Sequence, residues 1–158
     1  MTKNEQLIQQ FYTCFKNKDY SGMSNCYASN ATFSDPVFQN LKGEQIGKMW
    51  EMLIKRGHDL QLEFSNIQEL ENTTSADWVA TYTFSATGKK VTNRIQANFV
   101  IENDKIVLHR DNFSFYKWAR QAFGFAGLLF GWTGFLKESV RQKARKGLYA
   151  FIQKNASN

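Results

Sequence analysis

The residues with types and spacing suited to chemistry gather in two short stretches. The first is ATFSDPVF, residues 31–38, which we predict as a short strand carrying the carboxylate of Asp35 beside the only proline in the sequence. A carboxylate among apolar side chains is costly to bury without a partner. Asp35 therefore either faces water where Asp-Pro turns the chain, or lies in a pocket where burial raises its pKa and suits it to proton transfer.

The second stretch is His109-Arg110-Asp111 in the last predicted strand. Alternation along a strand places His109 and Asp111 on one face and Arg110 on the other. A histidine beside a carboxylate can orient a substrate or tune proton transfer. The alternative is structural, with Asp111 paired to a cation such as Arg94. If Asp35 and Asp111 face one pocket, one ionised and one protonated carboxyl would support movement of a proton between carbon atoms.

The sequence lacks the motifs that are typical of metal sites, phosphate binding and acyl transfer. His58 and His109 are too few and too far apart to predict a metal site, and Cys14 and Cys26 form no CxxC motif. The sequence also has no glycine-rich phosphate loop and no Ser/His/Asp order typical of acyl transfer. We therefore predict no cofactor and no metal. Two cysteines without a signal peptide predict a reducing compartment, the cytoplasm.

Three helices and a set of strands must position these residues. Apolar residues recur at three- and four-residue steps over residues 4–18 and 43–56, with a short helix predicted over 20–27 between them. From residue 58 to 115 the period changes to two, with turn signals at Thr87-Gly88 and Asn103-Asp104. Helices followed by an antiparallel meander predict an α+β domain whose curved sheet is covered on one face by helices.

The composition is rich in aromatic residues, with 14 Phe, 4 Trp and 6 Tyr among 158 residues. So many rings in one domain predict either a thick core or an apolar cavity for a flat ligand. The rings that we expect to line the cavity, or else to fill the core, are Phe15, Trp50, Trp78, Tyr82, Phe99 and Phe113.

The order of elements and one motif together resemble the cone-shaped, cystatin-like fold of the nuclear transport factor 2-like (NTF2-like) superfamily. The motif is Phe11-x3-Phe15-x3-Asp19-x3-Met23-x3-Tyr27-x3-Ala31-Thr32-Phe33-x-Asp35-Pro36-Val37, which looks like the start of a ketosteroid isomerase. The resemblance covers residues 4–115. It implies an NTF2-like or SnoaL-like domain over residues 1–115 and a homodimer. Residues 116–158 exceed what this fold requires, and we predict that they form a C-terminal helical extension packed on the same domain.

The resemblance also implies roles for the two stretches. Asp35 matches the general base of the isomerases. Asp111 matches the acid/base aspartate of SnoaL-like polyketide cyclases, with His109 as the partner that orients substrate or tunes the pKa of Asp111. The isomerases further use two hydrogen-bond donors to the developing oxyanion. Here the matching positions are Phe11 and Ala97, which cannot donate, so classical steroid isomerisation is not expected. Tyr12 is the next residue, but its side chain is turned about 100° from Phe11 around the helix, so it is a poor substitute for the missing donor.

The C-terminal segment has its own character. Residues 1–115 hold 12 basic and 13 acidic residues, a net charge of −1, whereas residues 116–158 hold eight basic residues and Glu138, a net of +7. Residues 123–135 form an apolar run of 13, shorter than the ~20 needed to span a membrane, followed by a basic amphipathic helix over 135–152. This segment could close the cavity mouth, form a dimer interface, or contact an anionic membrane peripherally.

Nucleic-acid binding is not expected, because the basic residues lack the strand-borne aromatic platform of single-strand binders. Two functions remain in view. One is a small cofactor-free isomerase or cyclase acting on an apolar carbonyl compound, with Asp35 and Asp111 moving a proton. The other is a non-catalytic domain that binds a small apolar molecule or a partner, which the absence of donors at Phe11 and Ala97 favours.

Overall fold

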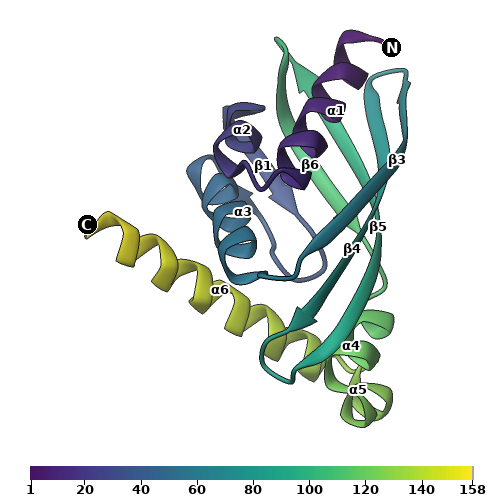
Figure 1. Ribbon diagram of the computed structural model, residues 1–158, viewed down its shortest axis with the longest axis vertical. Coiled ribbons are helices and arrows are strands. Elements are labelled where there is room, and N and C mark those ends of the chain that lie inside the picture. Colours follow the sequence, from purple (N-terminus) through teal and green to yellow (C-terminus); the bar gives the residue numbers. More distant parts are fainter. Residues whose placement is uncertain (158) are drawn as a thin grey trace.

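The computed structural model describes residues 1–157, with six helices and six strands in one α+β fold (Figure 1). The helices are α1 (Lys3–Lys16), α2 (Tyr20–Asn25), α3 (Glu44–Arg56), α4 (Phe115–Phe123), α5 (Phe125–Phe130) and α6 (Gly134–Ala156). The strands are β1 (Tyr27–Ser34), β2 (Leu41–Lys42), β3 (Gln61–Leu70), β4 (Thr73–Phe84), β5 (Lys89–Glu102) and β6 (Lys105–Asn112). The predicted fold class is confirmed.

The six strands form a single curved, unclosed sheet in the order β2-β1-β6-β5-β4-β3. Strands β3 to β6 are the predicted antiparallel meander, with turns at the two predicted positions. Strand β1 departs from that pattern, because it pairs in parallel with β6, the last strand of the meander. The register places Phe33 opposite His109, and His109 opposite Phe99, which brings three buried side chains of neighbouring strands into line.

Helices α1 and α3 lie over the concave face of the sheet (Figure 1). A capping box begins α1, in which Thr2 accepts from the Glu5 amide and the Glu5 carboxylate accepts from the Thr2 amide. Gly43, with φ of 56°, precedes α3, and Gly57 ends it. The apolar sides of both helices and the inner residues of the strands form the main core.

Several predicted boundaries were wrong near the candidate residues. The short second helix ends at Asn25, so Tyr27 opens β1 instead of closing a helix. Strand β1 ends at Ser34, so Asp35 lies just beyond the strand predicted to carry it. The last strand ends at Asn112 and not at residue 115, and Ser114 then caps helix α4 by accepting from the Lys117 amide.

Helices α4 and α6 fold back on the domain. Helix α4 buries Phe115, Trp118, Ala119 and Ala122 against Val91 in a second core cluster. Helix α6 crosses from this cluster, where Leu136 and Val140 pack, to the main core, where Leu148 is buried (Figure 1). Residue 158, the last of the predicted extension, lies outside the described residues.

Candidate functional site

Asp35 occupies a tight turn at the end of β1. Its Oδ1 accepts hydrogen bonds from the amides of Val37, at 2.6 Å, and Phe38, at 2.5 Å, and its own amide donates to the Phe38 carbonyl. The side chain is nevertheless half-buried. The pKa of Asp35 is raised to about 7, mainly by burial. The hydrogen bond from the Phe38 amide lowers this pKa, and the negative charge of Asp111 raises it. The turn and the titrating carboxyl therefore occur together at one residue.

The surroundings of Asp35 come from three separate segments. Tyr82 of β4 is half-buried, and burial followed by the charge of Asp35 raises its pKa. The Tyr82 hydroxyl accepts from Trp118 Nε1 of α4 at 2.7 Å, which leaves its proton free to be donated. Arg141 Nε of α6 donates to the Pro36 carbonyl at 2.9 Å, and its charge lowers the pKa of Asp35.

His109 and Asp111 are both buried on the inner face of β6, whereas Arg110 is exposed, as the alternation predicts. His109 Nε2 lies 2.9 Å from Asp111 Oδ1, which also accepts from Trp78 Nε1 at 3.4 Å. Arg94 is exposed and makes no ion pair with Asp111 within the described chain. The suggested Asp111–Arg94 pair is therefore wrong, and the partners of Asp111 are histidine and tryptophan.

A chain of hydrogen bonds continues from His109 to the other side of the core. Trp50 Nε1 donates to the Tyr27 hydroxyl at 3.0 Å, and when His109 is neutral the Tyr27 hydroxyl donates to His109 Nδ1 at 2.7 Å. His109 Nε2 then carries the proton donated to Asp111. This single arrangement satisfies every nitrogen along the path from Trp50 to Asp111.

The rings predicted to line a cavity mostly fill the interior. Phe15, Trp50, Trp78 and Phe99 are all buried, and the Phe15 ring centroid lies 5.1 Å from that of Trp50 and 5.5 Å from that of Trp78. The His109 ring has its centroid 4.2 Å from that of Phe99. Tyr82 and Phe113 differ, because they are half-buried where the main core meets the second cluster. Val37, two residues after Asp35, packs at the same junction of the two clusters as Tyr82 and Phe113.

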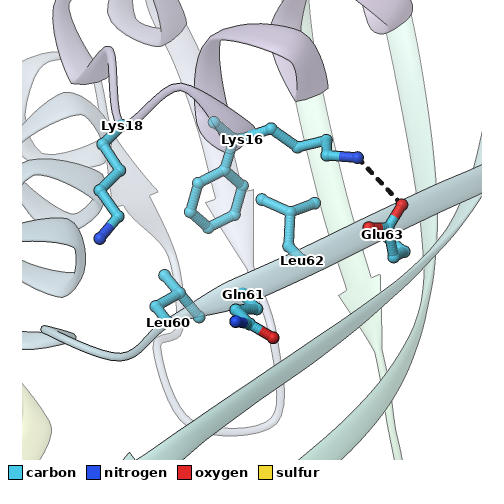
Figure 2. A pocket seen from close by; sticks show the side chains of 7 residues that line it. Lys16, Lys18, Leu60, Gln61, Leu62 and Glu63 are labelled. Carbon is cyan, nitrogen blue, oxygen red and sulfur yellow. Dashed lines mark hydrogen bonds and ion pairs between the residues drawn. The ribbon is translucent and has the colours of Figure 1, made fainter.

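An open cleft lies elsewhere, between the end of α1 and the start of β3 (Figure 2). It has a volume of about 360 Å³, and the ion pair between Lys16 Nζ and Glu63 crosses one side at 2.9 Å. The lining residues are Phe15, Lys16, Lys18, Leu60, Gln61, Leu62 and Glu63. A neighbouring cleft of about 310 Å³ shares Lys18, Leu60 and Gln61. Neither cleft includes Asp35, His109 or Asp111.

The structure thus brings His109 and Asp111 into direct contact and sets Asp35 near Asp111 in a different environment. Sequence analysis missed Tyr27, Trp118 and Arg141 as neighbours of these residues. The alternation of β1 could have revealed Tyr27, had the helix boundary been drawn earlier. Nothing local marks Arg141, which contacts a carbonyl 105 residues earlier in the chain.

Residues 1–157 lack two features, a metal-binding cluster and a membrane-spanning helix. No cluster of three or more His, Cys, Asp or Glu side chains in this range is arranged to hold a metal ion. No helix in this range combines the length and the apolar character that crossing a membrane requires.

Comparison with known proteins gives a family and a set of similar folds. The family model of the SnoaL-like domain matches residues 8–109. None of the curated proteins matches the chain. Among solved structures, a candidate polyketide cyclase from Xanthomonas campestris pv. campestris is 15% identical, with a TM-score of 0.64, over 76% of this chain and 96% of that one.

Two further solved structures share the fold. An epoxide hydrolase from M. tuberculosis, similar to the LEH type, is 14% identical with a TM-score of 0.60, over 85% of this chain and 95% of that one. A protein from Catenulispora acidiphila with a ketosteroid isomerase-like fold, solved with trimethylamine, is 10% identical with a TM-score of 0.65, over 74% and 92% of the two chains. At these identities the structural likeness establishes the fold, and the family model, which covers more than half of the sequence, establishes that the chain belongs to the SnoaL-like domain family of the NTF2-like superfamily.

Proposed function

We propose that this protein binds a small, mostly apolar carbonyl compound beside Asp35 and moves a proton between two of its carbon atoms. The observation that carries the proposal is the state of Asp35. Its Oδ1 is held by two amides, no hydrogen bond from residues 1–157 reaches Oδ2, and burial raises its pKa to about 7. A general base works best when its pKa lies near the working pH.

The proposed step needs no external reactant. Asp35 Oδ2 takes a proton from the carbon next to the carbonyl group, and the electron pair moves onto the carbonyl oxygen to form an enolate. The protonated Asp35 then returns the proton to another carbon of the conjugated system. Tyr82 would supply the hydrogen bond to the enolate oxygen that Phe11 and Ala97 cannot, because Trp118 already donates to the Tyr82 oxygen and leaves the hydroxyl proton available.

Hydrogen–deuterium exchange on a simple flat ketone tests this step. With 2-tetralone in D₂O, we expect the protein to accelerate exchange of the protons next to the carbonyl group, measured by ¹H NMR. Asp35→Asn should lose at least ~100-fold of the acceleration because the base is gone. Tyr82→Phe should lose roughly 100-fold because the enolate loses its donor.

The control is Asp104→Asn, which removes an exposed carboxylate in the turn between β5 and β6 and should leave exchange unchanged. The rate should rise with pH and level off above about 7, since the ionised form of Asp35 is the base. Equal exchange rates in the wild-type protein, Asp35→Asn and buffer would contradict the proposal.

A second function has an observation of its own. The interior around His109 is occupied by aromatic rings, and the two open clefts lie away from Asp35. This packing favours a non-catalytic domain that binds a small ligand or a partner. Native mass spectrometry of protein purified from its own source would detect such a ligand, and binding of 2-tetralone without exchange would favour this function.

A further inference from the structure

Large apolar side chains are exposed at the end of the molecule formed by α4, α5 and the start of α6 (Figure 1). Phe125, Trp132 and Phe135 are 74%, 76% and 86% exposed. We call the whole set the α5 patch: Phe125, Leu128, Leu129, Phe130, Trp132 and Phe135. Isolated apolar residues are normal on a surface, but a contiguous group of this kind marks an interaction site.

The backbone holds the α5 patch outward. A Cβ atom on Gly127 would lie 1.9 Å from the Ala119 carbonyl oxygen, so glycine allows α5 to pack directly on α4 and turn its large side chains away. The Tyr116 hydroxyl of α4 donates to the Leu128 carbonyl at 3.2 Å, and Trp132 Nε1 donates to the Leu129 carbonyl at 2.8 Å. The exposure is therefore a property of the folded α4–α5 unit.

The charge around the patch is mostly positive, and the nearest acid in sequence, Glu138, is paired with Arg141. Residues 113–137 contain Lys117, Arg120 and Lys137 and no acidic residue. Lys117 and Arg120 are exposed on α4. Lys89 adds a fourth cation. Its side chain lies against Gly124, at the junction of α4 and α5, with Cε 3.0 Å from the position that a Cβ atom on Gly124 would take.

We propose that the α5 patch docks on the surface of an anionic lipid bilayer, with its aromatic side chains among the headgroups and its basic residues on the lipid phosphates. Trp and Phe together with Lys and Arg are typical of surfaces that bind at the membrane interface. Aromatic residues and arginine are also enriched at protein–protein interfaces, but lysine, which supplies three of the four cations here, is depleted there and favours the lipid surface. This inference does not depend on the proposed function.

Docking in this orientation would bring the candidate site close to the bilayer. Phe135 of the patch and Arg141, which contacts Pro36, are six residues apart on α6, about 9 Å along the helix axis. An apolar ligand dissolved in the bilayer would therefore lie near the turn of Asp35.

Vesicle co-sedimentation tests the proposal on the full chain. We expect binding to vesicles of equal parts phosphatidylcholine and phosphatidylglycerol at low salt, weaker binding at high salt, and little binding to phosphatidylcholine alone. The double variant Phe125→Ser with Phe135→Ser should weaken binding at least ~10-fold, because two inserting rings are lost. The double variant Lys117→Gln with Arg120→Gln should weaken it ~10-fold and reduce its salt dependence.

Two controls match these variants. Leu70→Ser removes an apolar residue that is 65% exposed at the end of β3, and Lys143→Gln with Lys146→Gln removes two exposed cations of α6; we expect binding close to wild-type in both. Brominated lipid should quench tryptophan fluorescence in the wild-type protein and much less in Trp132→Phe, since the other three tryptophans are buried. The quenching measurement still tests the proposal if a double variant folds poorly.

Two results would overturn the proposal. One is failure of the wild-type protein to sediment with anionic vesicles at low salt. The other is a dimer in lipid-free solution, by light scattering, that Phe125→Ser with Phe135→Ser converts to a monomer, because the patch would then be an interface between two copies.

Discussion

Two carboxylates lie near each other in this protein and are held in different ways. Asp35 is bound by backbone amides at one oxygen and is half-buried, whereas Asp111 is buried and accepts from the side chains of His109 and Trp78. Within residues 1–157, both carboxylates keep an Oδ2 that no hydrogen bond reaches, but Asp35 is more exposed than Asp111. The proposed function therefore assigns contact with the ligand to Asp35.

The hydroxyls of Tyr27 and Tyr12 offer a matched test of the core network. Both tyrosines are buried, but Tyr27 bridges Trp50 and His109, whereas the Tyr12 hydroxyl has no hydrogen-bond partner within residues 1–157. We expect Tyr27→Phe to lower the free energy of unfolding by about 2–3 kcal/mol, because two buried nitrogens lose their partner.

Tyr12→Phe should change the free energy of unfolding by less than about 0.5 kcal/mol, or raise it, since no bond is lost. Urea denaturation of both variants measures the difference. Equal losses in the two variants would show that the bridge contributes no stability.

The raised pKa of Asp35 predicts a dependence of stability on pH that needs no substrate. The folded state binds this proton with a pKa of about 7, above the reference value of 3.8, so stability is full at low pH and falls as pH rises from about 4 to 7. Asp35→Asn keeps an acceptor for both amides and removes the charge. Its stability relative to wild-type should therefore grow to about 2 kcal/mol at pH 8, roughly half of the full value, because the carboxyl is partly solvated.

Urea denaturation at several pH values between 4 and 8 checks this, with Asp104→Asn as the exposed control. A difference between Asp35→Asn and wild-type that does not vary with pH would mean that Asp35 titrates as an ordinary exposed carboxylate.

At the scale of elements, α6 links the two cores and reaches the turn of Asp35. Leu136 and Val140 contact the second cluster, Leu148 enters the main core, and Arg141 between them donates to Pro36. Part of the basic C-terminal segment is therefore structural. The same helix leaves Lys143, Arg145 and Lys146 in water.

Replacing Arg141 should change the titration of Asp35. The guanidinium lowers the pKa of this carboxyl, so Arg141→Met should move it above about 7. ¹³C NMR of the Asp35 carboxyl measures the pKa directly, and Lys143→Met is the control on the exposed side of α6. An unchanged pKa in Arg141→Met would show that α6 has no electrostatic effect on the site.

At the scale of the whole molecule, two ends have different characters. The end of β3 lies beside the start of α1, where Glu5 accepts from the Glu69 amide, and the opposite end carries α4, α5 and the α5 patch (Figure 1). The homodimer remains a prediction. The outer face of the sheet carries the exposed polar residues Arg94, Gln96 and Arg110, and the light-scattering measurement on the α5 patch would also report the mass of the protein.

Much of this architecture could be predicted from local patterns. Three- and four-residue periodicity located α1 and α3 to within two residues, and period two located the meander and placed His109 and Asp111 on one face. These patterns succeed because they report the contacts of each element with one apolar core. Helix α4 was missed because Phe113 and Phe115 continue the strand alternation, and only the cap at Ser114 ends it.

The fold class, the family and the two stretches that carry carboxylates could therefore be predicted from local patterns. What each carboxylate contacts depends on packing between distant segments: the parallel pairing of β1 with β6, the bridge from Tyr27 to His109, and the placement of Arg141 and Tyr82 near Asp35. The physical reason is sequence separation. Tyr27 and His109 are separated by 82 positions in the sequence, and Pro36 and Arg141 by 105. Such pairs meet through the packing of whole elements, which no local periodicity records.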